Sequence, residues 1–180
     1  MNTASIEVRG PKGPDDCTVI DLDGLTSYSE LVAAIWSEID PDGENSSDDM
    51  PEGCTFTNPQ GFAVHLFQRQ LAHNGQFYDP LEPIAAFDDV LEAWSNERDD
   101  DRRQAMADYL DNGNDDLDGF EDAYEGQYKD GADFAEQLAD SFGAVSEENA
   151  RWICIDWEAT WERNLRHDYW ISDSGHVFRN

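Results

Sequence analysis

Alternating apolar and polar residues predict short strands at the beginning of the chain. The segments Ile6–Val8 and Thr18–Leu22 are rich in β-branched residues and are flanked by Gly, Pro and Asp, as is typical of strands. A helical pattern follows, in which Ser27 is placed to cap the helix and Glu30 completes a capping box. The apolar stripe of this predicted helix consists of Leu31, Ala34, Ile35 and Ile39.

The middle of the chain changes from an alternating pattern to a helical one. Phe62, Val64 and Leu66 alternate like a strand. They belong to the segment 53–78, which we expect in the core of the first domain because its large apolar side chains need burial. From Pro83 onward, apolar residues recur at helical spacing. These residues are Ile84, Phe87, Leu91 and Trp94, then Ala105, Met106, Tyr109 and Leu110, and the run Asn112-Gly113-Asn114 ends the pattern.

The remaining third of the chain predicts two short helices and a hairpin. The helices have apolar faces formed by Leu117, Phe120 and Tyr124 and by Phe134, Leu138 and Phe142, and their opposite faces are acidic. Trp152–Ile155 is predicted as a buried strand or turn, and Asp156 as the N-cap of a further helix. Tyr169–Ile171 and His176–Phe178 are predicted to pair as a hairpin.

These elements predict an α+β fold. We expect an elongated chain of small domains with short antiparallel strands and short acidic helices. The predicted domains are an amino-terminal α+β domain at residues 1-82, a helical middle domain at 83-114 and a carboxyl-terminal α+β domain at 115-180. The acidic helices would belong mainly to the last of them.

Charge is the feature that narrows the function. The 180 residues include 41 Asp and Glu against 11 Lys and Arg, a formal net charge of −30. With 39 % hydrophobic and 12 % aromatic residues, the chain is too apolar for a disordered acidic tail, so we expect a folded protein. The charge argues against binding to nucleic acid or to an anionic membrane, since both need basic surface. It favours basic partners, metal cations or a high-salt habitat.

No sequence motif points to catalysis or to a cofactor. The chain has no GxSxG, HExxH, GxGxxG or phosphate-loop motif. Its three cysteines, Cys17, Cys54 and Cys154, are odd in number and form no CxxC pair, which favours neither a disulfide framework nor a zinc site. We expect a protein that is not an enzyme and needs no cofactor. We also expect a cytoplasmic protein, because no signal peptide or transmembrane segment is evident.

One acidic loop partly matches a calcium-binding pattern. Positions 1, 3, 5, 6 and 12 of an EF-hand loop would be taken by Glu38, Asp40, Asp42, Gly43 and Asp49. Position 8 is Asn45 instead of an apolar residue, and position 12 is Asp instead of Glu. Met50-Pro51 also disfavours a following helix. We therefore expect an acidic loop without a specific ion.

The densest charge lies in residues 115–140, with ten carboxylates and a single cation, Lys129. Such a run is an ordinary solvated face, the surface of a halophilic protein, or a mimic of a polyanion. Halophilic acidity should coat the whole molecule, whereas residues 53–78 carry no acid. Duplex DNA carries about one charge per 1.7 Å, so the net charge of −30 corresponds to roughly 15 base pairs.

Several ordered residue blocks between residues 105 and 180 form a recognisable pattern. They are Phe120-Glu121, Tyr124, Gly126, Tyr128, Asp133-Phe134-Ala135, Leu138, Ile155-Asp156-Trp157-Glu158-Ala159, Arg163, Asp168-Tyr169 and Gly175-His176-Val177-Phe178. Together with the acidic lead-in LDNGNDDLDGFED, these blocks resemble the carboxyl-terminal half of the ArdA antirestriction family. The part before about residue 85 has no block typical of that family.

The resemblance implies a non-catalytic DNA mimic encoded by a mobile genetic element. Its partner would be the basic DNA-binding groove of a type I restriction-modification enzyme. It also implies an elongated homodimer that contacts itself through the carboxyl-terminal domain, with Tyr124, Gly126 and Tyr128 as candidate dimer contacts. The candidate mimic surface consists of Asp99, Asp100, Asp101, Asp108, Asp111, Asp115, Asp116, Asp118, Glu121, Asp122, Glu125, Asp130, Asp133, Glu136 and Asp140.

Two other functions stay open. One is an acidic protein-interaction module that inhibits another DNA-binding defence protein or a nucleoid protein. The other is a halophilic enzyme. Acidic residues confined to one continuous ridge would favour mimicry, whereas uniform acidity would favour halophily.

Overall fold

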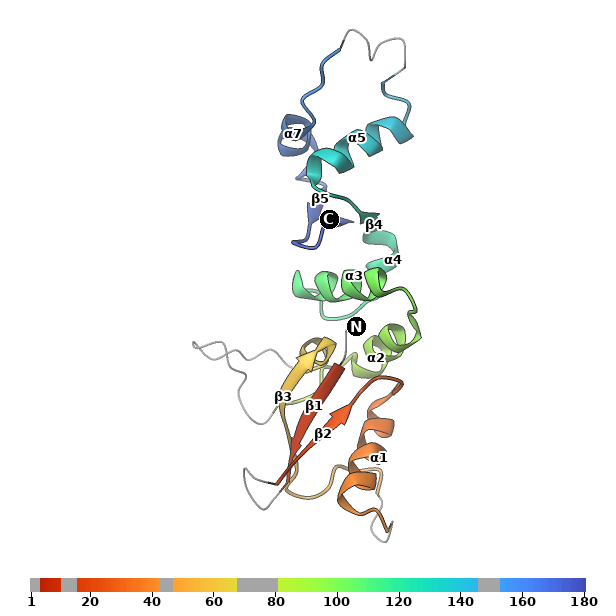
Figure 1. The fold of residues 1–180 in the computed structure, drawn as a ribbon, viewed down its shortest axis with the longest axis vertical. Helices are drawn as coiled ribbons and strands as arrows, with labels where there is room; N and C mark the ends of the chain where they lie inside the picture. The colour runs from red at the N-terminus through yellow and green to blue at the C-terminus, as the bar shows by residue number, and fades with distance from the viewer. Residues whose placement is uncertain (1–3, 11–15, 43–46, 68–80, 146–152) are drawn as a thin grey trace, which may run out of the picture. The chain divides into compact units, whose positions relative to one another are not determined.

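The structure is a computed structural model that describes residues 4–10, 16–42, 47–67, 81–145 and 153–180 (Figure 1). The described residues form an α+β protein with six α-helices and two small antiparallel sheets, so the predicted fold class is confirmed. The chain divides into two compact units, Met1–Leu117 (unit 1) and Asp118–Asn180 (unit 2).

A three-stranded sheet begins unit 1. The central strand β1 (Ala4–Arg9) pairs antiparallel with β2 (Cys17–Asp21) and with β3 (Thr55–Gly61). Every second residue of β1 is buried, as expected for a strand with one face on the core. The two strands predicted at the beginning of the chain are therefore confirmed.

Helix α1 (Tyr28–Ile39) begins at the predicted cap. The Ser27 side chain accepts a hydrogen bond from the backbone N–H of Glu30 at 3.3 Å. The Glu30 carboxylate accepts from the backbone N–H of Thr26 at 2.6 Å, one residue before the cap. The capping box is thus present in a shifted form, because the carboxylate reaches past Ser27.

The buried face of α1 differs from the predicted stripe at one end. Leu31, Val32 and Ile35 are buried, whereas Ala34 is only half-buried. Ile39 is 46 % exposed, so its assignment to the apolar stripe is wrong. Ile39 is the last residue of the helix, where the chain turns away into Asp40 and Pro41.

The strand predicted at Phe62, Val64 and Leu66 is also wrong. Strand β3 ends at Gly61, whose φ of 58° lies in the left-handed region that favours glycine. Residues Phe62–His65 then form a 3₁₀ helix. In the described part of this segment, Phe56, Phe62, Leu66 and Phe67 are at most 4 % exposed, which confirms the expected burial for them, whereas Val64 is half-buried. Residues 68–80 lie outside the described residues.

Helices α2 (Phe87–Asn96) and α3 (Asp100–Asp111) confirm the helical pattern that follows Pro83. They belong to the same unit as the first sheet. The Trp94 indole stacks on Phe62, with 4.8 Å between ring centroids and 7° between planes. Aromatic stacking therefore joins α2 to the 3₁₀ helix.

Two side chains of α2 also bond to the backbone near the start of α1. Asp88 accepts a hydrogen bond from the Tyr28 N–H at 2.6 Å, and Ser95 donates to the Leu25 carbonyl at 2.6 Å. The helices of segment 83-114 thus contact α1 and the 3₁₀ helix, and they belong to the same unit as the first sheet. The three-domain division stays a prediction, and the described contacts group the chain into the two units given above.

Unit 2 contains the second sheet, in which the order of strands is β4 (Tyr124–Gln127), β6 (His176–Arg179) and β5 (Tyr169–Ile171). All pairs are antiparallel, and β5 and β6 form the predicted hairpin. Trp170 stacks on Phe178 across this hairpin, with 4.3 Å between ring centroids. The sheet is therefore built on aromatic contacts.

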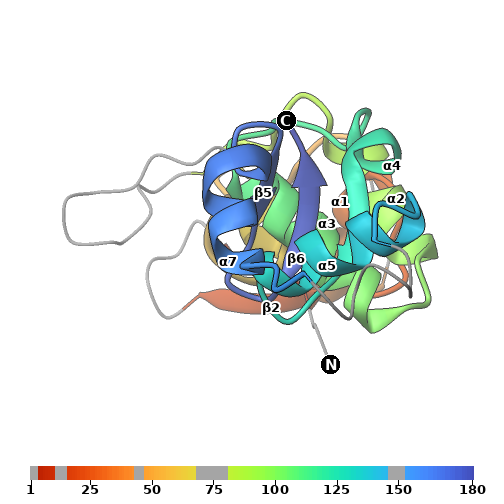
Figure 2. The same cartoon turned by 90° about the horizontal axis from the view of Figure 1, so that it is seen from above.

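Two helices complete unit 2. Helices α5 (Gly131–Ser141) and α7 (Trp157–Thr160) lie side by side (Figures 1 and 2). A π-helical turn, Trp161–Leu165, continues α7. Asp156 accepts a hydrogen bond from the Ala159 N–H at 2.9 Å, which confirms it as an N-cap.

Three predictions in unit 2 are wrong. Helix α4 (Phe120–Ala123) is one turn long, and Tyr124 begins strand β4 instead of completing a helical face. Phe142 is 78 % exposed, because α5 ends at Ser141 just before it. Ile153 is 52 % exposed, so the described residues of Trp152–Ile155 do not form a buried strand or turn.

A glycine sets the distance between α5 and the π-helical turn. A Cβ atom placed on Gly131 would overlap the Trp161 indole ring. The same indole makes an edge-to-face contact with Phe134, at 6.0 Å between centroids. A side chain at position 131 would therefore push the indole away from the aromatic core.

We predict that Gly131→Ala destabilises unit 2 by about 1–3 kcal/mol, the usual range for overpacking. The measurement is thermal and urea unfolding followed by near-ultraviolet circular dichroism. In the double variant with Trp161→Phe, the smaller ring should recover part of the loss. Full stability of Gly131→Ala would contradict the proposed packing.

Candidate interaction surface

Three consecutive carboxylates form the start of helix α3. Asp99 is the N-cap and accepts a hydrogen bond from the Asp101 N–H at 2.9 Å. Asp100 and Asp101 lie in the first turn, where the helix dipole favours negative charge. All three side chains are exposed. These predicted surface acids therefore stabilise the helix that carries them.

Glu97 joins α2 to α3, although the sequence analysis does not single it out. Its carboxylate accepts hydrogen bonds from the backbone N–H groups of Asp99 and Arg98, at 2.9 and 2.7 Å. It also accepts from the Arg102 side chain at 2.9 Å. The bond from Asp99, with the contacts of Arg102 and Arg98, holds the pKa of Glu97 below its usual range. In the sequence, Glu97 could have been identified only by its position two residues before the helix cap Asp99.

Helix α5 begins with a similar arrangement. Asp130 is its N-cap and accepts a hydrogen bond from the Asp133 N–H at 2.9 Å. The Asp133 carboxylate accepts from the Lys129 N–H at 3.1 Å and from the Gln137 amide at 3.0 Å. The Lys129 N–H and then the Gln137 amide hold the pKa of Asp133 below its usual range. These acids therefore belong to the helix start as well as to the surface.

Two further acids of the candidate surface have partners inside their own unit. Asp108 is buried and accepts a hydrogen bond from the Gln104 amide at 2.9 Å. Glu125 is half-buried and forms an ion pair with Arg179 at 2.7 Å. Both were predicted to face a partner, and burial makes Asp108 unsuitable for that role.

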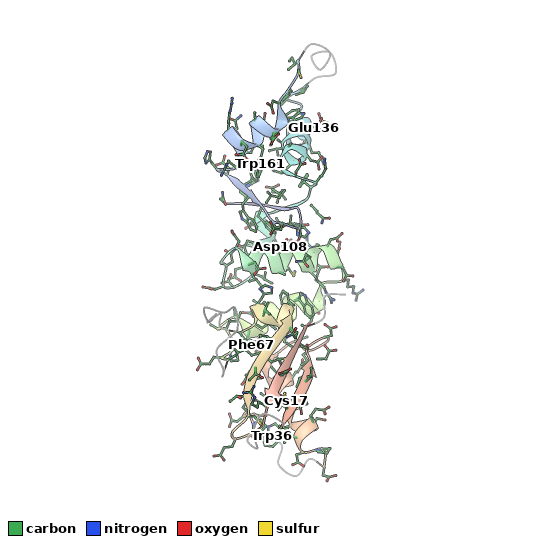
Figure 3. The ribbon with its side chains drawn as sticks, turned by 60° about the vertical axis from the view of Figure 1, so that its left-hand side comes forward. Cys17, Trp36, Phe67, Asp108, Glu136 and Trp161 are labelled. Carbon is green, nitrogen blue, oxygen red and sulfur yellow. The ribbon has the colours of Figure 1, made fainter. Side chains whose placement is uncertain are left out.

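The other acids predicted for the surface are exposed, apart from the half-buried Asp133. In unit 1 the exposed ones are Asp99, Asp100, Asp101, Asp111, Asp115 and Asp116. In unit 2 they are Asp118, Glu121, Asp122, Asp130, Glu136 and Asp140. Glu136 lies on α5, and the buried Asp108 lies on α3 (Figure 3). Most of the candidate surface is therefore accessible to solvent within each unit.

Several Lys and Arg side chains form ion pairs or a cation–π contact within their own unit. Arg102 pairs with Glu97, Arg166 with Glu162 and Lys129 with Asp130, the last at 3.7 Å. The Arg103 guanidinium lies over the Trp94 ring, 4.8 Å from its centroid. With only 11 cations for 41 acids, most of the negative charge stays uncompensated in any arrangement.

Acids at the carboxyl ends of helices oppose the helix dipole. Glu38 in α1, Asp111 in α3 and Asp140 in α5 lie in last turns that contain no basic residue. The partial charge at this end of a helix is negative, so an added carboxylate is destabilising. All three residues are exposed. Asp111 also lies 3.9 Å from the buried His65 ring. The helix dipole does not stabilise any of the three carboxylates.

Exposed acids also lie outside the candidate surface. In unit 1 they include Glu30, Glu38, Asp42, Asp48, Asp49, Glu52, Asp88, Asp89 and Glu92. These residues come from α1, the loop after it and α2. Within unit 1, therefore, acidity is broader than the segment that starts at Asp99.

The candidate dimer residues make contacts inside unit 2. Tyr124 stacks on Phe120, with 5.3 Å between centroids. The Tyr128 hydroxyl donates to the Glu125 carbonyl at 3.0 Å. Gly126 has a φ of 120°, a conformation that side chains rarely adopt. All three are half-buried, so only their outer edges are accessible to a partner.

The described residues contain neither a cluster of side chains that could bind a metal ion nor a helix that could span a membrane. Among the described residues, no three His, Cys, Asp or Glu side chains come together in a way that could hold a metal ion. Gly43 and Asn45 of the calcium-like loop lie outside the described residues. The three cysteines are free thiols. In the described ranges, no helix is both long and apolar enough to cross a membrane.

Comparison of the chain with models of known protein families, with curated proteins and with solved structures found no match. The resemblance to antirestriction proteins therefore depends on the residue blocks between 105 and 180.

We predict that Glu97→Gln lowers the free energy of unfolding by about 1–2 kcal/mol at neutral pH, because charged hydrogen bonds are lost. The depressed pKa of Glu97 means that its contribution is present above the unfolded value of about 4.5 and is lost as pH falls through the folded value. The difference from the unchanged protein should therefore shrink below about pH 4.5. Urea unfolding across a pH series measures it.

Glu92→Gln is the matched control, because Glu92 is an exposed acid of α2 in the same unit. It removes one charge and should change stability by less than about 0.5 kcal/mol. Equal losses for both variants would show that Glu97 does not join α2 to α3.

Proposed function

We propose that the protein is a non-catalytic DNA mimic that occupies the basic DNA-binding groove of a type I restriction-modification enzyme. It acts as an antirestriction protein, as a homodimer and without a cofactor. Such a protein works in the cytoplasm, where its target enzyme meets DNA. The proposal combines the ArdA-like residue blocks with the display of acids on both units.

The observation that carries the proposal is exposed, uncompensated acidic charge on ordered helices. The acids on α3, α4 and α5 belong to regular structure and are not part of a flexible tail. Fixed carboxylates lose less conformational entropy on binding than mobile ones. A groove lined with Lys and Arg therefore gains the full attraction at a small ordering cost.

Acids at the carboxyl ends of helices support a role for the charge itself. Asp140 opposes the dipole of α5, so it is retained at a cost in helix stability. Asp111 opposes the dipole of α3 in the same way, although it also lies beside His65. A surface that competes with DNA needs such charge wherever the partner presents cations. The long-range field of both units would also raise the association rate by about 10–10³-fold at low salt.

A dimer would double the charge available to the target. Two chains carry a net charge of about −60, which corresponds to roughly 30 base pairs of duplex. A twofold assembly also suits a target that binds a long DNA site. The contact between copies would use the outer edges of Tyr124, Gly126 and Tyr128.

A second candidate function is supported by the broad acidity of unit 1. Exposed acids on α1 and α2 lie outside the blocks that resemble the antirestriction family. They suit a module that inhibits another DNA-binding defence protein or a nucleoid protein through the same charge complementarity. The same acidity is expected of a halophilic protein, which would unfold when salt is withdrawn.

We predict that the protein displaces duplex DNA from a type I methyltransferase core and that displacement weakens as salt rises. Ion pairs in a groove are screened by counterions, so the apparent affinity should fall steeply between about 50 mM and about 500 mM NaCl. Fluorescence anisotropy of labelled DNA measures displacement. Circular dichroism over the same salt range verifies folding and separates halophily from mimicry. Displacement that is equal at both salt concentrations would contradict a charge-based mechanism.

We further predict that a triple amide variant of unit 2 binds the target less tightly. Asp122→Asn, Glu136→Gln and Asp140→Asn change exposed acids of the candidate surface. Three lost ion pairs should weaken inhibition roughly tenfold in total. The readout is the inhibition constant in a restriction assay.

The matched control removes three exposed acids outside the candidate surface, by Asp42→Asn, Glu52→Gln and Glu82→Gln. The net charge is then the same in both variants. If both variants lose inhibition equally, the proposed surface is not the binding site. If neither variant loses inhibition, the charge-based mechanism is contradicted.

A further inference from the structure

The carboxyl end of α1 borders a hollow in unit 1, and the proposed function does not use this hollow. Its volume is about 380 Å³. One helical face contributes Ala33, Trp36 and Ser37, which are spaced at i, i+3 and i+4. The rest of the lining consists of Asp40, Pro41, Ser47 and Asp48. Figure 3 labels Trp36, the one aromatic residue among those that line the hollow.

The indole of Trp36 is held in place at one side of the hollow. Its Nε1 donates a hydrogen bond to the Asp49 carbonyl at 2.9 Å. The backbone N–H of Asp49 in turn donates to the Ser47 hydroxyl at 3.2 Å. The loop after α1 and the indole are thus fixed to each other, so this aromatic wall exists before any ligand binds.

The electrostatics of the hollow favour a cation. It lies where the negative end of the α1 dipole is located, and the last turn of α1 contains no basic residue. Asp40 is the C-cap of α1, and Asp40 and Asp48 both line the hollow. An indole face adds a third attraction, because Trp is the strongest aromatic partner of cations.

The lining is suited to an organic cation. In the described part of the chain, no three metal-ligating side chains converge on one point. The volume is within the range of small-ligand sites and far exceeds that of a single ion. A planar guanidinium can stack on an indole and donate to carboxylates at its edge, whereas an ammonium acts as a point charge. Arginine is therefore the side chain that best matches the indole of Trp36 and the carboxylates of Asp40 and Asp48.

We propose that this hollow receives an arginine side chain of a protein partner. The guanidinium lies against Trp36 and donates hydrogen bonds to Asp40 and Asp48. The identity of the partner rests on the proposed function, because a groove that binds DNA presents arginine side chains. The hollow adds a contact of defined geometry to the general attraction between charged surfaces. It therefore assigns a binding role to the part of the chain that does not resemble the antirestriction family.

The test uses the full chain labelled with ¹⁵N and a capped Gly-Arg-Gly peptide as the probe. Binding is followed through the Trp36 indole N–H resonance and the backbone amides of Ala33 and Ser37. Peptides with citrulline or lysine in place of arginine are the comparison ligands. Citrulline keeps the shape but lacks the charge, so it should bind at least roughly threefold more weakly than arginine. Lysine should fall between the two.

Two matched variants test whether the arginine peptide binds at the hollow. Asp48→Asn should weaken arginine binding at least roughly threefold, because one charged hydrogen bond is lost. Asp89→Asn is the control, since Asp89 is an exposed acid of α2 in the same unit. Both variants carry the same net charge, and unchanged backbone spectra verify their folds. Equal binding of citrulline and arginine, or equal effects of the two variants, would overturn the proposal.

The outcome is independent of the antirestriction assay, because no restriction enzyme takes part. Loss of the arginine preference would overturn the hollow as a site and leave DNA competition unaffected. A clear arginine preference in a protein that does not inhibit restriction would support the hollow and overturn the proposed function. The two proposals therefore fail separately.

Discussion

Repulsion among like charges is the constraint on which the rest of the structure depends. A net charge of −30 on 180 residues opposes compact folding, so each unit needs a strong apolar core. Aromatic pairs provide it: Phe62 stacks on Trp94 in unit 1, and Trp170 stacks on Phe178 in unit 2. Such pairs contribute about 0.5–1.5 kcal/mol each beyond the burial of their area. The stabilisation from aromatic contacts thus offsets the repulsion among the many acidic residues.

The same constraint divides the acids by their physical role. Carboxylates at helix starts, such as Asp99 and Asp130, cap the backbone and lie where the dipole favours them. Glu97 links two helices through three hydrogen bonds. Acids in the last turns of helices, such as Asp140, oppose the helix dipole and are exposed. This division explains how a chain can display so much charge and remain ordered, because part of the charge stabilises the elements that carry the rest.

Much of the fold could be predicted from local patterns, and most of the errors have a common physical cause. Strands β1 and β2, the caps at Ser27 and Asp156 and the final hairpin follow from residues close together in the sequence. The misassigned elements depend on backbone geometry or on distant contacts. Gly61 ends strand β3, and a 3₁₀ helix follows it in place of the predicted strand. Phe142 is exposed because α5 ends before it. The exposure of most of the predicted surface acids could be predicted. The burial of Asp108 depends on tertiary packing, and the hollow beside Trp36 depends on the path of the loop that follows α1.

In the proposed mechanism, fixed carboxylates take the place of DNA phosphates in a basic groove. An experimental structure of the protein bound to the core of a type I methyltransferase tests this most directly. Exposed acids of α3 and α5 are expected within about 4 Å of the Lys and Arg side chains that otherwise contact DNA phosphates. A complex in which the groove remains open to DNA, with the protein bound elsewhere, would contradict it.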